Sequence, residues 1–220
     1  MVGRSKFDIV AFDVDGTLVD DVYFVWETLH DYFGTPRDSR DMAFHSYMEG
    51  KWTYEQWFQH DIKLMREKNA DRESILLAIK DMKLFAGVED TLVTLREEGA
   101  YLVIISGSLD VVVDKLGLRR FFEEIYLNSF TFGGQGELLG GIPTPYDVWD
   151  KATGLRQIAE RRQVPMTSTA FIGDNFNDVA VAKAAGFAIA YNCKSDELAS
   201  VADVMVPGGS FPQLLDHLLD

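Results

Sequence analysis

The sequence predicts an α/β fold, in which a Rossmann-like parallel sheet carries helices on both faces. Short apolar runs alternate with helical patterns along most of the 220 residues, which is typical of parallel strands joined by right-handed crossovers. Residues 20–83 show helical spacing only, and residues 131–141 are rich in glycine, as in a β-hairpin. We therefore expect a catalytic core of residues 1–19 and 84–220, a helical cap domain of residues 20–83, and one hairpin.

Composition narrows the class of protein. The formal net charge of 21 − 35 = −14 argues against a nucleic-acid partner, which needs a basic face. Cys193 is the one cysteine, so no disulfide framework exists and a cytoplasmic location is expected. No apolar run reaches the roughly 18 residues of a membrane span. The expected partner is a small molecule, and the chain is expected to be a monomer or homodimer.

The first strand is predicted at residues 7–12, an apolar run that is typical of a buried central strand. Asp13 and Asp15 follow directly, and two ionised carboxylates are not tolerated inside a buried strand. They are expected at the carboxyl edge of the sheet, where ligands of such folds bind. In the cap, Thr53 and Gln56 form a candidate capping box that opens a helix.

The remaining elements follow from periodicity and from glycine breaks. Trp57 and Phe58 are expected to pack inside the cap, whereas Tyr54 is equally suited to packing and to contacting a substrate. Further helices are predicted near residues 88–98, 109–116, 151–162, 177–185 and 212–219. Further strands are predicted at residues 101–105, 125–126, 169–172, 187–190 and 204–206.

Three predicted strand ends carry polar groups that should meet at one edge of the sheet. Besides Asp13 and Asp15 these are Ser106 with Gly107, and Asp174 with Asp178. Paired aspartates can divide the work, with one attacking and the other handling a proton. An aspartate that attacks a phosphoryl group meets repulsion of about 4 kcal/mol per charge pair at about 4 Å, which a divalent cation removes. Magnesium, which prefers oxygen ligands, suits this acidic group.

Other residue types fit the binding of phosphate. Ser106 and the amides of Gly107 and Ser108 are predicted at a strand–helix junction, where the helix dipole favours an anion. Lys151 can offset the negative charge of a transferring group, and Lys115 competes for that role. Asn177 either binds the substrate or caps the following helix.

These residues resemble the haloacid dehalogenase (HAD) superfamily, and within it the phosphoserine-phosphatase-like enzymes. The resemblance covers nearly the whole chain and includes the cap segment 49–56. Residues 13–18 together with residues 173–178 are its most specific part, whereas the serine and lysine motifs alone are weak. The matching residues are Asp13-Val14-Asp15-Gly16-Thr17-Leu18, Ser106-Gly107, Lys151 and Gly173-Asp174-Asn175-Phe176-Asn177-Asp178.

The resemblance implies a magnesium-dependent phosphatase that acts through an aspartyl-phosphate. Asp13 would be the nucleophile, and Asp15 would protonate the leaving alcohol and then activate water. Magnesium would bind Asp13, the backbone carbonyl of Asp15 and Asp174. Asp178 would stabilise these ligands without binding the ion directly. The cap would close over the substrate and select it. The phosphoryl oxygens would be held by Ser106, Gly107 and Lys151.

Two departures from the family pattern concern the substrate. Val22 stands where phosphoserine phosphatases carry a glutamate for the ammonium, and Asp61 where they carry an arginine for the carboxylate; a shifted alignment would offer Arg66 instead. We therefore expect a small phosphomonoester other than phosphoserine. Phosphoserine phosphatase proper and a phosphotransferase or phosphomutase remain the alternatives. Asp15 argues against a dehalogenase, and the intact reacting positions argue against a non-catalytic binding module.

Overall fold

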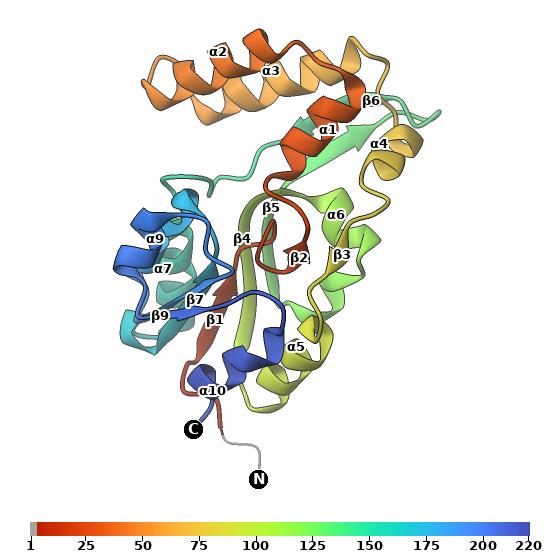
Figure 1. Ribbon diagram of the computed structural model, residues 1–220. Coiled ribbons are helices and arrows are strands. Elements are labelled where there is room, and N and C mark those ends of the chain that lie inside the picture. Colours follow the sequence, from red (N-terminus) through yellow and green to blue (C-terminus); the bar gives the residue numbers. More distant parts are fainter. Residues whose placement is uncertain (1–3) are drawn as a thin grey trace.

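The computed structural model describes residues 4–220 and contains a seven-stranded sheet of order β6-β5-β4-β1-β7-β8-β9. All neighbouring strands are parallel except the β5–β6 hairpin. This confirms the predicted fold class, including the hairpin (Figure 1). The strands of this sheet are β1 (Ile9–Phe12), β4 (Tyr101–Leu109), β5 (Glu124–Phe132), β6 (Leu138–Ile142), β7 (Thr169–Gly173), β8 (Phe187–Tyr191) and β9 (Val204–Val206).

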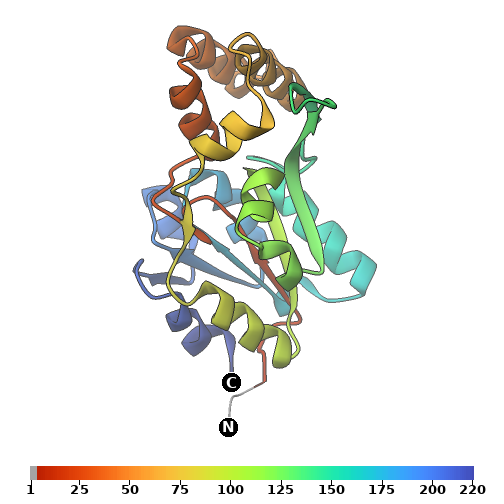
Figure 2. The ribbon, with the colours of Figure 1, turned by 90° about the vertical axis from the view of Figure 1, so that its right-hand side faces the viewer.

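Helices cover both faces of the sheet and the edge at which the parallel strands end (Figures 1 and 2). The α-helices are α1 (Val25–Phe33), α2 (Arg37–Met48), α3 (Tyr54–Arg66), α4 (Arg72–Ala78), α5 (Val88–Glu97), α6 (Asp110–Lys115), α7 (Lys151–Arg162), α8 (Val179–Ala184), α9 (Asp196–Val201) and α10 (Leu215–Leu218). The 3₁₀ turns are η1 (Leu118–Phe121), η2 (Met166–Ser168), η3 (Phe176–Asp178) and η4 (Phe211–Leu214).

Strand β1 lies at the centre of the sheet, and every one of its residues is buried. Val10 and Phe12 pack in the larger core with α5, α6 and η4, while Ile9 and Ala11 pack in a second core with α7 and α8. Burial on both faces explains why this strand is a continuous apolar run instead of an alternating one. Strands β4 and β7 pair with β1 on either side, so the residues that follow these three strands meet at one edge.

Helices α1–α4 occupy the predicted cap segment and lie beyond that edge of the sheet (Figure 1). Helix α3 begins with the expected capping box, formed by Thr53 and Gln56. A short antiparallel ladder of β2 (Val19–Asp20) and β3 (Lys83–Leu84) joins the segment to the rest of the chain. No strand was predicted between residues 20 and 83, because two-residue strands have no readable period. The division into two domains stays a prediction.

Further elements differ from the sequence prediction. Strand β5 is longer than the predicted residues 125–126, and the predicted helix of residues 212–219 divides into η4 and α10. Strand β4 continues to Leu109 instead of ending at Ile105, and helix α9, opened by the side chain of Ser195, was not predicted. Within the described residues, no helix is both long and apolar enough to cross a membrane.

Candidate active site

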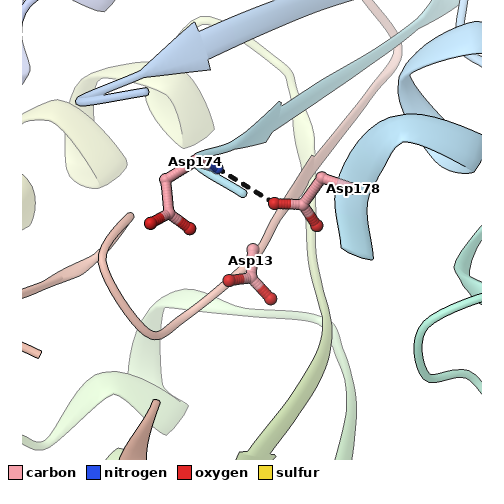
Figure 3. A group of neighbouring side chains, drawn as sticks. All are labelled: Asp13, Asp174 and Asp178. Atoms are coloured by element: carbon pink, nitrogen blue, oxygen red, sulfur yellow. Dashed lines mark hydrogen bonds between the residues drawn. The ribbon is translucent and has the colours of Figure 1, made fainter. Parts of the chain in front are cut away.

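Three aspartates converge at the carboxyl edge of the sheet. Asp13 follows β1, Asp174 follows β7, and Asp178 ends η3; all three are nearly fully buried. Each offers a carboxylate oxygen, and these oxygens lie within 4.8 Å of one another. Figure 3 shows the three side chains close together, with Asp178 bonded to the amide of Asp174.

Backbone hydrogen bonds fix the aspartates in this arrangement. The amide of Asp13 donates to the carbonyl of Ile172 on the neighbouring strand, at 2.9 Å. Oδ2 of Asp178 accepts from the amides of Asp174 at 3.0 Å and Asn175 at 3.3 Å (Figure 3). Asp178 therefore holds the turn that carries Asp174.

Lys151, the first residue of α7, supplies a positive charge at the centre of this group. Its Nζ lies 2.6 Å from Oδ1 of Asp13 and 2.7 Å from Oδ1 of Asp178, and its side chain is fully buried. Burial alone would lower the pKa of Lys151, but the two carboxylates raise it above its usual range, so the ammonium stays charged. The competitor Lys115 instead donates to the carbonyls of Lys80 and Met82.

Asp15 stands beside Asp13 in a different environment. Its carboxylate accepts hydrogen bonds from Oγ of Ser108 at 2.6 Å and from the amide of Val25, the first residue of α1, at 2.7 Å. Burial raises the pKa of Asp15 to about 6, although these hydrogen bonds lower it. Two adjacent carboxyl groups thus differ in surroundings, as an acid and a nucleophile should.

Ser106 and Gly107 lie in the last residues of β4. Helix α6 begins at Asp110, directly after the strand and one residue from its predicted start, so a strand–helix junction lies where it was expected. The contribution of the helix dipole to these amides stays a prediction. The pairing of β4 with β5 shifts between Ile105 and Leu109, which releases the intervening backbone from the regular ladder. An irregular strand end that leads directly into α6 presents these groups to the site.

The Gly107 carbonyl is held from two directions. It accepts from Nε1 of Trp26 on α1 at 3.0 Å and from Nδ2 of Asn128 on β5 at 2.7 Å. Asn128 also bonds the hydroxyl of Tyr54 on α3. These contacts tie the cap segment to the strand end.

The acidic group fits a divalent cation. Burial, followed by the charge of Asp13, raises the pKa of Asp174 to about 8, which shows how poorly the buried carboxylates are compensated. A Cβ on Gly16 would lie 2.2 Å from Oδ2 of Asp174, so only glycine leaves the carboxylate its place. Lys194 donates to the same oxygen at 2.8 Å. Oxygen ligands of this kind are those that Mg²⁺ prefers.

A cavity of about 260 Å³ opens above the carboxylates, between the sheet edge and the cap. Asp13, Asp15, Ser106, Gly107 and Asn177 line one end of the cavity. Trp57 and Phe58 line its walls as well, although the sequence analysis expected them only to pack inside the cap. The hydroxyl of Tyr54 faces Asn128, and its side chain also lines the cavity.

Of the two residues at the positions that contact the substrate in the family pattern, only one lines the cavity. Asp61 lines the cavity and lies 3.1 Å from His60 and 3.5 Å from His30, whereas Val22 is buried away from the cavity wall. Arg66 lies beside a different surface hollow, next to the turn of the β5–β6 hairpin, and does not replace the missing arginine. Glu27 and Arg40, which the sequence analysis did not single out, line the cavity.

Asn177 does not cap the helix that follows it. Asn177 lies inside η3, which the side chain of Asn175 caps by accepting from the amide of Phe176 in a capping box with Asp178, and α8 after it begins without a side-chain cap. Sequence reasoning also missed Ser108 and Lys194 as partners of the carboxylates. Ser108 adjoins a predicted site residue, but no pattern in the sequence connects Lys194 with Asp174.

Comparisons with known proteins agree with this geometry. A family model described as a haloacid dehalogenase-like hydrolase matches residues 7–186. A phosphoserine phosphatase of Methanocaldococcus jannaschii is 26% identical over 98% of this chain and 99% of its own length. Phosphoserine phosphatase SerB2 of Mycobacterium tuberculosis is 32% identical over 56% of this chain, but that stretch is only 30% of SerB2. A solved substrate-bound phosphoserine phosphatase complex shares the fold, with a TM-score of 0.76 at 24% identity over 98% of this chain and all of that one.

The chain belongs to the haloacid dehalogenase-like hydrolase family. The predicted likeness to phosphoserine phosphatases within that family is confirmed, as is the prediction of an enzyme of the HAD phosphatase type.

Proposed function

We propose that this protein is a Mg²⁺-dependent phosphatase that hydrolyses a small phosphomonoester, other than phosphoserine, through an aspartyl-phosphate on Asp13. The observation that carries the proposal is the pairing of Asp13 with a buried, charged lysine beside two further aspartates, while Asp15 next to it keeps a raised pKa. The phosphoserine phosphatases among its relatives support this reading.

The first step needs a nucleophile and an acid on one substrate. Oδ of Asp13 attacks the phosphorus atom, and the bond from phosphorus to the alcohol oxygen breaks. Asp15, with its pKa of about 6, gives its proton to that oxygen. In the second step, Asp15 takes a proton from a water molecule that attacks the phosphoryl-aspartate, so that phosphate leaves and both carboxyl groups are restored.

The remaining groups handle charge and position. Lys151 neutralises Asp13 and the phosphoryl oxygens that approach it, and Ser106 with the bulged backbone at Gly107 supplies hydrogen-bond donors. Asp13, Asp174 and the carbonyl of Asp15 would hold Mg²⁺, and Asp178 positions Asp174. The cation would supply positive charge that lets an anionic nucleophile approach an anionic phosphate.

The substrate is proposed to differ from phosphoserine because neither position that the family pattern assigns to an amino-acid contact carries the expected side chain, and the guanidinium of Arg40 in the cavity wall already pairs with Asp31. Asp61 in the wall would repel a substrate carboxylate, and Val22 cannot bind an ammonium. A cytoplasmic location and a monomeric or dimeric state are part of the same proposal.

Release of phosphate from p-nitrophenyl phosphate tests the reaction. We expect turnover with Mg²⁺ and its loss when a chelator is added. Asp13→Asn should lower kcat by about 10⁴-fold or more, because residues that act as a unit lose most of the rate when one is removed. If Asp13→Asn keeps most of its activity, the covalent mechanism is wrong.

Two controls separate the alternatives. Phosphoserine should be a poorer substrate than several phosphorylated alcohols and amines, and a clear preference for it would favour phosphoserine phosphatase proper. Addition of a second alcohol should not divert the phosphoryl group from water, as it would in a phosphotransferase or phosphomutase.

A further inference from the structure

The walls of the cavity are built mainly from aromatic rings. Helices α1 and α3 contribute Trp26, Tyr54, Trp57 and Phe58, and Phe176 of η3 adds another ring. The lining therefore offers a substrate apolar faces with negative π-electron density, which attract cations.

These rings are held in place by their neighbours. Trp57 stacks on Tyr47 with the ring centres 5.0 Å apart, and Trp26 meets Phe58 edge to face at 5.5 Å. The indole of Trp26 is also anchored to the Gly107 carbonyl. Rigid walls of this kind select a ligand by its shape and charge, because no wall has to be ordered when the ligand binds.

A carboxylate beyond the reacting group adds negative charge to the same cavity. Glu27 lines it and has no ion-pair partner within residues 4–220. Asp147 also lines it but lies at the reacting end, against Gly107 and under the influence of the Lys151 charge. The one guanidinium in the lining, that of Arg40, donates to Asp31 at 3.0 Å and is thereby compensated. The part of the cavity formed by the cap thus carries the negative charge of Glu27 without a paired cation.

An unused acceptor lies in the same cavity. Asn177 is more than nine-tenths buried, and no donor from the described part of the chain reaches its Oδ1. A buried amide oxygen without a partner is costly, and a ligand that donates a hydrogen bond there would remove the cost.

From these features we infer that the substrate is an alkylammonium phosphomonoester, in which the leaving alcohol bears a positively charged nitrogen and no carboxylate. The inference rests on the proposed phosphatase function and names the substrate class of that site. The ammonium lies among the aromatic faces and near Glu27, while the phosphate lies at Lys151. The volume of about 260 Å³, below the roughly 300–1,000 Å³ of pockets for drug-sized ligands, limits the alcohol to a few heavy atoms.

Four phosphomonoesters of similar size, assayed for phosphate release with Mg²⁺, test the inference. Phosphocholine and phosphoethanolamine carry the cation, 3,3-dimethylbutyl phosphate is the neutral isostere of phosphocholine, and 3-phosphoglycerate carries a carboxylate. We expect kcat/KM for at least one cationic ester to exceed that of the neutral isostere by about tenfold or more, which corresponds to roughly 1.4 kcal/mol. The carboxylate ester should be the poorest substrate.

Two pairs of variants locate the preference in this cavity. Trp57→Leu should lower the ratio of kcat/KM for phosphocholine over the neutral isostere at least about threefold, whereas Trp57→Phe, which keeps an aromatic face, should preserve most of the ratio. Glu27→Gln, an exposed and nearly isosteric change that does not endanger folding, should lower the same ratio, and Glu27→Asp should retain it. An unchanged ratio in both Trp57→Leu and Glu27→Gln overturns the inference.

The outcomes distinguish this inference from the function on which it rests. An enzyme that hydrolyses p-nitrophenyl phosphate but prefers the neutral or the carboxylate ester contradicts the alkylammonium class alone. An enzyme that releases phosphate from neither p-nitrophenyl phosphate nor any of the four esters contradicts the proposed phosphatase.

Discussion

At the scale of single residues, Asp15 shows how neighbours divide the work of two carboxyl groups. Burial raises the pKa of Asp15 and the hydrogen bonds from Ser108 and Val25 lower it, so that the pKa is about 6. The Val25 amide belongs to the cap segment, so the acid is completed only where cap and core meet. Its proton affinity depends on both parts of the chain.

Ser108→Ala should move the pH profile of the reaction. Without the hydroxyl, the carboxylate form of Asp15 loses stabilisation and its pKa rises further. The falling limb of kcat/KM, which reports loss of the acid's proton in the free enzyme, should then shift to higher pH. Ser108→Thr keeps a hydroxyl and should restore the original profile; a limb that stays in place in Ser108→Ala would show that another group supplies the proton.

The sequence was sufficient to predict which residues gather, but not all of their partners. Asp13 and Asp174 follow apolar runs, so the edge of the sheet on which they lie follows from parallel topology alone. Lys194 reaches Asp174 across 20 positions from an irregular segment, and such a contact leaves no periodic trace. The bond from the Ser108 hydroxyl to Asp15 was not predicted, because it depends on the irregular end of β4.

At the scale of elements, the hairpin supports the cap. Helix α3 packs on β6, where Gly141 lies against Phe58 and against the backbone of Ser129. A Cβ on Gly141 would lie 2.3 Å from the Ser129 carbonyl oxygen and 2.7 Å from Cζ of Phe58. The glycines that favoured a hairpin over a phosphate-binding loop thus include one required for contact between elements.

Gly141→Ala should lower the free energy of unfolding by about 1–3 kcal/mol, the usual cost of overpacking. Gly140→Ala is the matched control, because a Cβ there meets nothing within 4 Å, and it should change stability by less than about 1 kcal/mol. Urea titration of both variants measures the difference. Equal free energies of unfolding for the two variants would mean that the cap and the hairpin are not closely packed at Gly141.

The long elements were predictable, and the short ones were not. Strand β1 and helices α5 and α7 were predicted to within about two residues, since apolar periodicity and glycine stops define them. The β2–β3 ladder and the six-residue α9 are too short for a period, and their positions come from tertiary contacts. The β4 extension likewise depends on its pairing with β5.

At the scale of the whole molecule, burial of like charges makes stability depend on pH. The pKa of Asp174 rises from 3.8 to about 8 on folding, so between these values the folded state holds a proton that the unfolded state has lost. The stabilisation is complete below about pH 4 and disappears as pH rises through about 8. A cation bound to the carboxylates would offset that loss.

The metal-free protein, in the presence of a chelator, should therefore have a lower Tm at pH 8 than at pH 5. Mg²⁺ should raise Tm more at pH 8 than at pH 5, because binding competes with protons. Asp174→Asn should make Tm depend less on pH and less on Mg²⁺ than in the wild-type protein, as measured by differential scanning calorimetry. A larger effect of Mg²⁺ at pH 5 than at pH 8 would contradict a carboxylate-bound cation.

The β2–β3 ladder has a consequence for how this enzyme can acquire new substrates. Because Asp20 pairs with Lys83 and Val19 with Leu84, the chain leaves the core and re-enters it at neighbouring points. The segment of about 60 residues between β2 and β3 can be lengthened, shortened or exchanged without displacing either of these strands. Changes in that segment that keep the bonds from Val25 to Asp15 and from Trp26 to Gly107 alter the cavity walls while the carboxylates below them stay in place.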